Sequence, residues 1–437
     1  MNGFLNVFNK KKQYTENLPV NKMNSSIEKW SAMYENRYSD TDSEKSLNLA
    51  AAICSELARL TTIEFKTSLT GSNRADFLNL QYQRIVDKAR VFTEYACAKG
   101  GVVLKPYLEK GQIFVGVIQA DAFYPTSFSQ DGEITGAVFY ETHYMDGYYF
   151  TRCEEHGFFG NVYVIKNTAY KSKSADERGD EVSLTAVRKW ADLEPVCRIE
   201  NIKRPLFVYF KMPAANTKNC ESPLGVSAFA RAVDLIKDAN KQYSDLLWEY
   251  ESGKRALFLD ECAIRRNEDG SSSLPQKRLY RMLSTGDDTL FKDWSPEMRD
   301  INLLHGLDRI LRSIEFNCGL AYGTLSDLQS VEKTAEEIKA SKQRSYATVC
   351  DIQKALQKAL EELILTMDIY CDIYSLAPKG EILKSFEFDD SIVCDRTAEF
   401  SEKLTLLEKG VIKPWEFRMW YFNEDEETAH KKSGENN

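Results

Sequence analysis

The chain has 437 residues, of which 43% are hydrophobic and 28% charged, and this composition is typical of a folded globular protein with two or three packed regions rather than a disordered one. The net charge of −9 argues against tight, general binding of nucleic acid, but it is compatible with a protein that lets nucleic acid slide past. No apolar run approaches the ~18–20 residues of a transmembrane helix, and residues 1–20 lack the apolar core of a signal peptide, so we expect the protein to stay where it is made.

The first hundred residues are predicted to be mainly helical. Apolar residues recur at helical spacing in three segments, residues 27–37, 43–60 and 74–98, and a strand is expected at residues 61–69. Residues 101–170 are instead rich in Val, Ile, Phe and Tyr, with X-Gly breaks that are typical of hairpins. They predict a meander of five strands at residues 102–108, 112–119, 133–144, 147–153 and 161–167. A polar loop at 171–193 and strands at 197–202 and 206–211 follow.

Two amphipathic helices are predicted next, at residues 227–251 and 296–318, and they flank a compact interruption at residues 254–293. Ser295, Pro296 and Glu297 form a favourable helix start. The interruption contains two predicted strands, at 255–262 and 277–283, and it is locally basic within an acidic chain. The first helix ends in acidic residues, among them Asp245 and Glu249, so we expect the charged faces of the pair to line a lumen or to face solvent.

A far longer helix is predicted at residues 334–377. Thr334 and Glu337 form a capping box, apolar or small residues recur at a spacing close to 3.6, and Pro378 ends the pattern. Such a helix would be ~63 Å long. Most globular helices are much shorter, so its length indicates an elongated or oligomeric architecture. A strand at 382–388, a helix at 396–409, a turn at 410–414 that leads into residues 415–422, and a ragged acidic tail at 423–437 complete the prediction.

The sequence contains none of the common catalytic motifs: no GxxxxGK[ST] phosphate loop, no GxGxxG, no HExxH and no GxSxG. The four histidines lie far apart, and the ten cysteines form no CxxC pair, so neither a metal nor a cofactor is expected and buried reduced thiols are the simplest interpretation. The acid pairs at 287–288 and 389–390 are compatible with a hard cation, but paired acids in turns are more often solvated.

The interruption carries a basic patch with two interpretations. It is either the solvated face of a hairpin or a docking surface for a protein or a nucleic acid. Its members are Arg265, Arg266, Lys277, Arg278 and Arg281.

Four segments resemble the portal proteins of tailed double-stranded DNA phages. They are SPLGVSAFARA at 222–232, ESGKRAL at 251–257, FNCGLAYGTLS at 316–326 and KTAEEIKASKQRSY at 333–346. The last two are typical of the branch found in long-tailed phages and prophages, and the layout agrees over about residues 40–425. The resemblance implies an α+β phage portal fold that assembles as a ring, usually of twelve subunits, at one capsid vertex.

The resemblance also implies a division of the chain. The expected parts are an N-terminal arm (1–39), a wing of helices and β-meander (40–225), a first stem helix (226–253), a clip of α/β type (254–295), a second stem helix (296–320), a tunnel-loop region (321–333), a long wing helix with a wing strand (334–395) and a short crown with the C-terminal tail (396–437).

Particular residues acquire expected roles by the same analogy. Asp245 and Glu249 would face the channel, and the basic patch of the clip would dock the terminase or the adaptor. The tunnel loop that narrows the channel around DNA would consist of Leu325, Ser326, Asp327, Leu328, Gln329, Ser330 and Val331.

A portal of this kind is not an enzyme, carries no cofactor and is not membrane-bound. Its implied partners are further copies of itself, the terminase large subunit, the head–tail adaptor, the major capsid and scaffold proteins, and double-stranded DNA passing through the channel. Its location would be the virion, after assembly in the host cytoplasm. Two alternatives remain open: a scaffold or adaptor that binds partners through the long helix without forming a channel, and an enzyme with an unrecognised site in the β-rich region.

Overall fold

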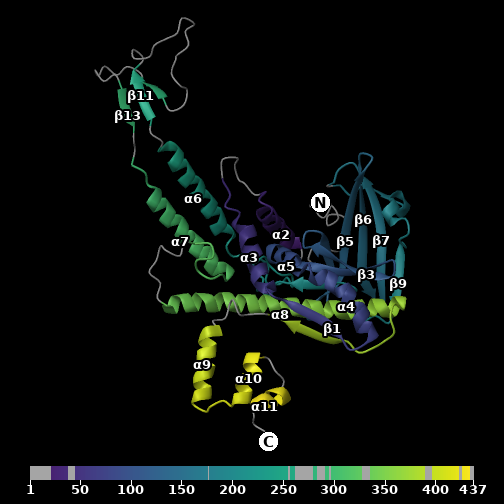
Figure 1. Cartoon of the computed structure of the whole chain (residues 1–437). Coiled ribbons are helices and arrows are strands. Elements are labelled where there is room, and N and C mark those ends of the chain that lie inside the picture. The colour runs from purple at the N-terminus through teal and green to yellow at the C-terminus, as the bar shows by residue number, and fades with distance from the viewer. Residues whose placement is uncertain are drawn as a thin grey trace.

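The computed structural model describes residues 21–37, 45–175, 177–253, 256–260, 279–282, 291–294, 297–326, 335–388, 396–422 and 426–433 (Figure 1). In these residues, helices combine with four separate sheets, which confirms the α+β class. A mixed body lies on one side of Figure 1, a helical hairpin projects from it with a small sheet at its tip, and one long helix crosses beneath both.

The N-terminal part of the body is helical, as predicted. Its helices are α2 (Asn21–Tyr34), α3 (Leu49–Thr62), α4 (Asn73–Val86) and α5 (Ala89–Lys99), and strand β1 (Lys66–Thr70) lies between α3 and α4. The expected single helix at 74–98 is wrong, because the chain breaks at Asp87 and Lys88. No Gly or Pro marks this break. After the break, α5 buries Phe92 in the core and packs against α3. Tertiary packing, and not a local sequence signal, therefore determines that the chain changes direction here.

The β-rich region forms two sheets rather than one meander. The first has the order β10-β2-β3, from β10 (Val208–Lys211), β2 (Gly101–Glu109) and β3 (Gln112–Gln119). The second has six strands, with the path β4-β5-β6-β7-β8 and with β9 also paired to β7. Its strands are β4 (Phe123–Phe128), β5 (Ile134–Met145), β6 (Tyr148–Phe159), β7 (Val162–Ser172), β8 (Asp180–Val182) and β9 (Val196–Glu200).

Two parts of the β-rich region differ from the prediction. Strand β4 was not expected, because Pro125 interrupts its pattern; it lies at the sheet edge and its pairing with β5 is irregular there, where proline is tolerated. The segment 171–193 is not only a polar loop. It contains β8 and two 3-10 helices, Leu184–Ala186 and Arg188–Trp190, and the second of these buries Trp190 at 1% exposure.

The projecting hairpin consists of α6 (Val233–Ser252) and α7 (Asp300–Cys318), which pack side by side (Figure 1). Both helices were predicted, but each begins later than expected. Residues 228–232 form turns before α6, and residues 297–299 are not helical. The tip carries β11 (Ala256–Asp260), β12 (Leu279–Met282) and β13 (Phe291–Trp294), with β11 central, parallel to β12 and antiparallel to β13.

The long helix is confirmed as α8 (Ala335–Tyr374), which has 40 residues. A stripe of residues at the predicted spacing is buried along it: Ser345, Val349, Ile352, Leu356, Leu360, Leu363, Met367 and Tyr370. Its capping box falls partly outside the described residues, because Thr334 is not among them. The chain then returns as β14 (Leu383–Glu387), which pairs antiparallel with β1 and so closes the body around α8.

Three helices end the chain beneath α8 (Figure 1). They are α9 (Arg396–Glu408), α10 (Pro414–Phe422) and α11 (Glu426–Ser433). The ragged tail expected from residue 423 onward is therefore wrong for α11. His430 of α11 stacks on Trp415 of α10 with ring centroids 4.3 Å apart, and this contact stabilises a helix that its polar sequence did not indicate.

Candidate functional site

The α6–α7 hairpin is held together by an apolar seam and by one ion pair at its outer end. Val233, Ile236 and Leu246 of α6 are buried, and Leu307 and Ile314 are buried on α7. These positions recur at helical spacing, so each helix forms because one stripe can be buried against its neighbour.

The outer end is closed by Glu249 and Arg299. The Glu249 carboxylate is 7% exposed. It accepts hydrogen bonds from the Arg299 backbone N–H at 3.0 Å and from Nη2 at 2.9 Å. The hydrogen bond from the Arg299 side chain, followed by the bond from its backbone, lowers the pKa of Glu249. Of the two acids predicted to face a channel, Asp245 is exposed, whereas Glu249 lies against the start of α7.

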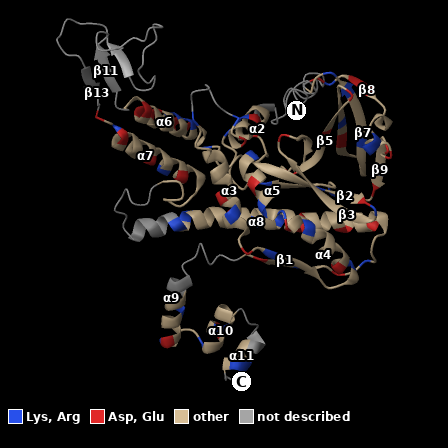
Figure 2. Cartoon of the chain, turned by 45° about the horizontal axis from the view of Figure 1, so that its top comes forward, with Lys and Arg blue, Asp and Glu red and all other residues tan. Residues whose placement is uncertain are grey.

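The outer half of the hairpin exposes large apolar side chains. Trp248 on α6 and Ile301 on α7 are each 64% exposed, and Met298 and Leu304 are 42% and 43% exposed. Such a concentration of exposed apolar side chains on one element is typical of a surface that another protein covers. In Figure 2 the ribbon of the same hairpin is coloured red and blue at its charged positions, and α6 carries five acidic residues against Lys237 and Lys241.

The chain between α7 and α8, called the connector below, begins with a segment that is hydrogen-bonded to α7. Gly319 ends α7 with a φ of 71°, in the left-handed region. The fully buried Glu315 then accepts backbone hydrogen bonds through Oε1 from Gly323 (3.0 Å), Leu325 (2.6 Å) and Ser326 (2.9 Å).

Of the predicted tunnel loop, only Leu325 and Ser326 belong to the described residues. Asp327, Leu328, Gln329, Ser330 and Val331 lie outside them. The sequence reasoning overlooked Glu315. The signal was present, since Ile314 and Cys318 place this acid beside the buried stripe of α7, and a Gly-containing turn follows it.

The small sheet at the tip corresponds to the predicted interruption. Arg281 of the basic patch lies in β12, whereas Arg265, Arg266, Lys277 and Arg278 fall outside the described residues. Whether the five basic residues form one surface therefore stays a prediction.

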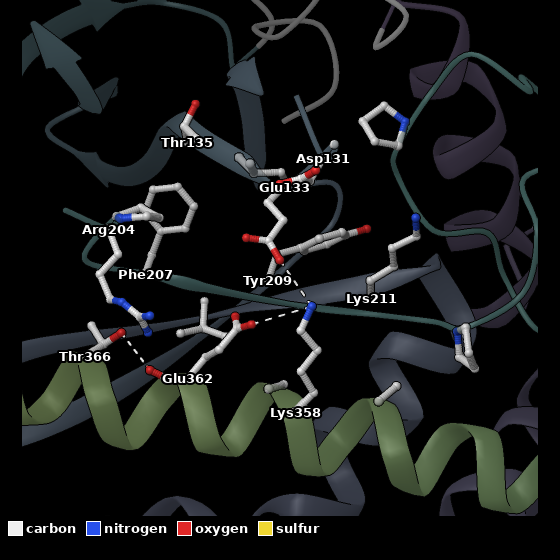
Figure 3. Close-up of a pocket in the computed structure, with 18 residues that line it drawn as sticks. Asp131, Glu133, Thr135, Arg204, Phe207, Tyr209, Lys211, Lys358, Glu362 and Thr366 are labelled. Atoms are coloured by element: carbon white, nitrogen blue, oxygen red, sulfur yellow. Dashed lines mark hydrogen bonds and ion pairs between the residues drawn. The ribbon is translucent and has the colours of Figure 1, made fainter. Parts of the chain in front are cut away.

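A cavity of about 390 Å³ lies between α8 and the sheet edge above it (Figure 3). In Figure 3, Lys358 points up from α8 and bridges two carboxylates, with Nζ 3.1 Å from Glu133 and 3.7 Å from Glu362. Burial raises the pKa of Glu362, and the opposing pull of Lys358 does not offset it. Three acidic and three basic side chains line the cavity, so its charge is balanced and it favours no charged ligand.

The β-rich region contains a buried histidine that an enzyme hypothesis has to consider. His156 is 1% exposed; its Nδ1 lies 2.8 Å from the Tyr163 hydroxyl and its Nε2 lies 2.7 Å from Glu154. Glu154 also pairs with Lys105 of β2 at 2.7 Å, so the cluster joins the two sheets. Burial lowers the pKa of His156 despite the neighbouring carboxylate. Because His156 is buried and its ring nitrogens bond to Tyr163 and Glu154, the contacts seen here are those of a cluster that packs the two sheets together.

Among the described residues, no group of three or more His, Cys, Asp or Glu side chains is placed to hold a metal ion. None of the helices described is both long and apolar enough to cross a membrane.

Comparison with known protein families gives a match over nearly the whole chain. The model of the family described as "Phage portal protein, SPP1 Gp6-like" matches residues 8–431. No curated protein gives a significant match. Because the family match spans nearly the whole chain, including the hairpin, the connector and α8, the chain belongs to the phage portal proteins of the SPP1 Gp6-like family.

Proposed function

We propose that twelve copies of this chain form a ring at one capsid vertex, and that double-stranded DNA is packaged and later ejected through its central channel. Family membership supports the general role. The observation that carries the proposal is the α6–α7 hairpin, which projects from the body and exposes Trp248 and Ile301 at 64% each. In a ring, the hairpins of neighbouring subunits would cover these side chains and form the channel wall.

Charge supports a channel through which DNA slides. Twelve copies at −9 would carry a net charge of about −108, and an acidic wall repels phosphates instead of releasing their counterions by binding them. The exposed Asp245 of α6 would contribute to this wall. The connector sequence LSDLQSV at 325–331 contains no Lys or Arg, so it would contact DNA without gripping it.

The remaining parts acquire roles within the same proposal. Residues 254–295 at the tip would form the clip, which docks the terminase large subunit during packaging and the head–tail adaptor afterwards. Residues 40–225 and 334–395 would form the wing, which meets the major capsid and scaffold proteins, and residues 396–437 would form a short crown. ATP hydrolysis would belong to the terminase, in agreement with the missing phosphate-loop motif.

The alternative of an adaptor that binds partners through its long helix is less well supported. Leu356, Leu360 and Leu363 of α8 are fully buried against elements of the same chain. The apolar stripe that a partner would need is therefore already covered.

Electron microscopy of the purified protein tests the ring directly. We expect rings with a central hole; monomers or dimers alone at high concentration would contradict the proposal. Docking is tested separately by reversing the charges of Arg265, Arg266, Lys277 and Arg278. Rings should persist while terminase or adaptor attachment fails, and unchanged DNA packaging and head–tail joining would exclude this assignment of the clip.

A further inference from the structure

One carboxylate organises the start of the connector that follows α7. Glu315 is fully buried, and its Oε1 accepts the three amide hydrogen bonds from Gly323, Leu325 and Ser326. Its other oxygen, Oε2, accepts a hydrogen bond from the Ser326 hydroxyl at 2.9 Å. A single side chain of α7 thus accepts hydrogen bonds from three backbone N–H groups and one hydroxyl of the residues that follow the helix.

The Ser326 hydroxyl extends this arrangement. It donates to Glu315 and also accepts a hydrogen bond from the Gly323 backbone N–H at 3.2 Å. Residues 323–326 are therefore hydrogen-bonded both to one another and to the Glu315 side chain of α7. Hydrogen bonds to an ionised group are stronger than those between neutral groups, and these lie out of water, where competition is smallest.

The far side of the connector is held to the same helix end. Arg344 of α8 lies over the ring of Phe316, 4.4 Å from its centroid, and over Tyr322 at 5.5 Å. At Gly319 a Cβ atom would come within 2.3 Å of the Thr348 hydroxyl, so α7 and α8 approach closely here. The start of the connector and the facing part of α8 therefore both pack against the end of α7.

We propose that Glu315 is a positioning residue of the portal: it fixes where the connector leaves α7, and through that it sets the distance between the connector and the DNA in the channel. This inference rests on the proposed function, since it requires that the connector meets DNA. The reason for a carboxylate is chemical. One oxygen has to accept three N–H groups, which an alkyl side chain cannot do and an amide does more weakly.

Three variants separate the contributions. Glu315→Leu removes all the bonds at similar volume. Glu315→Gln keeps one acceptor oxygen but loses the charge, and Ser326→Ala removes only the contact to Oε2. Glu297→Gln, on an exposed glutamate just before α7, is the matched control.

Two readouts are taken on rings of the full-length chain: amide hydrogen exchange of residues 320–326 by mass spectrometry, and the DNA content of heads assembled with each variant. We expect rings to form, exchange to rise on the order of tenfold in Glu315→Leu and less in Glu315→Gln, and packaged DNA to be lost in the same order, with the control like wild type. If Glu315→Leu does not fold, Glu315→Gln and Ser326→Ala carry the test.

The exchange rates test the role of Glu315, and the DNA content tests the placement of the connector in the channel. Exchange equal to wild type in all three variants would overturn the positioning role of Glu315. Faster exchange with wild-type DNA content would leave that role intact and instead contradict the placement of the connector in the DNA channel.

Discussion

At the scale of single residues, Glu141 on β5 is a partly buried carboxylate with several hydrogen-bond donors around it. It accepts hydrogen bonds from Arg152 at 2.9 Å, from Lys189 at 2.6 Å and from the Trp190 indole at 3.2 Å. Burial alone would raise its pKa, but the Lys189 hydrogen bond and the Arg152 charge outweigh burial and lower the pKa from 4.5 to about 2. Glu141 thus ties the 3-10 turn of Trp190 to the sheet.

This shift predicts a pH dependence of stability. Because the pKa in the folded state is below that of the unfolded chain, the ionised carboxylate stabilises the fold fully above pH 4.5 and progressively less as the pH falls toward 2. We expect Glu141→Gln to lower the free energy of unfolding by about 2 kcal/mol at pH 7. Denaturant unfolding at several pH values measures this difference, which should shrink in acid.

The exposed Glu109 gives the control for that experiment, since Glu109→Gln should have little effect at any pH. A difference between Glu141→Gln and wild type that stays constant from pH 7 to pH 3 would contradict the assigned role of the carboxylate.

A second residue-scale prediction concerns Arg74, which is 2% exposed and joins α4 to α8. Its Nε lies 2.5 Å from Asp368, and its Nη2 lies 2.7 Å from Asp372. Arg74→Leu should lower the free energy of unfolding by about 2 kcal/mol, which is less than for a fully buried pair because both carboxylates are partly hydrated. Thermal unfolding measures the change. Arg90→Leu, at an exposed position of α5, is the control, and an equal loss there would argue against a specific role of the ion pairs.

At the scale of elements, α8 is the member that connects the other layers. Its buried face contacts β10, β2 and α3, and near its end the Tyr370 hydroxyl donates to the Pro106 carbonyl of β2 at 2.9 Å. This hydrogen bond from a side chain to a backbone carbonyl links α8 directly to β2.

That contact can be tested with a matched pair of tyrosines. Tyr370→Phe leaves a buried carbonyl without this donor and should cost about 1–2 kcal/mol of unfolding free energy. Tyr374→Phe, one turn later and 49% exposed, should be neutral. Thermal unfolding of both variants measures the difference. Equal melting temperatures for the two would show that this hydrogen bond does not stabilise the contact between α8 and β2.

At the scale of the whole molecule, the proposed ring would cover the exposed apolar side chains of the α6–α7 hairpin with a neighbouring copy. Trp248→Lys and Ile301→Lys should weaken assembly, since a buried charge would replace apolar area in each interface of a ring. We expect the concentration for half-maximal assembly to rise about tenfold or more, measured by mass photometry or sedimentation.

Phe159 provides the control for assembly, because it is 75% exposed at the far end of β6, away from the hairpin. Phe159→Lys should assemble as wild type does. Rings of normal stability in Trp248→Lys and Ile301→Lys would exclude the hairpin as the subunit interface.

The sequence by itself determined the elements whose signals are local. The 3.6-residue spacing along α8 and along the α6–α7 hairpin follows from which side chains have to leave water, and the X-Gly turns at Gly111, Gly132 and Gly147 require left-handed backbone that glycine adopts freely. The family resemblance rests on short sequence segments, so it could also be recognised from the sequence, and the family match confirms it.

Only the tertiary structure decided the features that depend on contacts between distant residues. The break between α4 and α5, the division of the meander into two sheets and the helix α11 lack strong local signals, because each is stabilised by packing against partners elsewhere in the chain. The same holds for the site. In the sequence, Glu249 and Glu315 are simply two acids on predicted helices. In the structure, Glu249 binds Arg299 and Glu315 binds the connector amides, because the fold and not the sequence spacing selects hydrogen-bond partners.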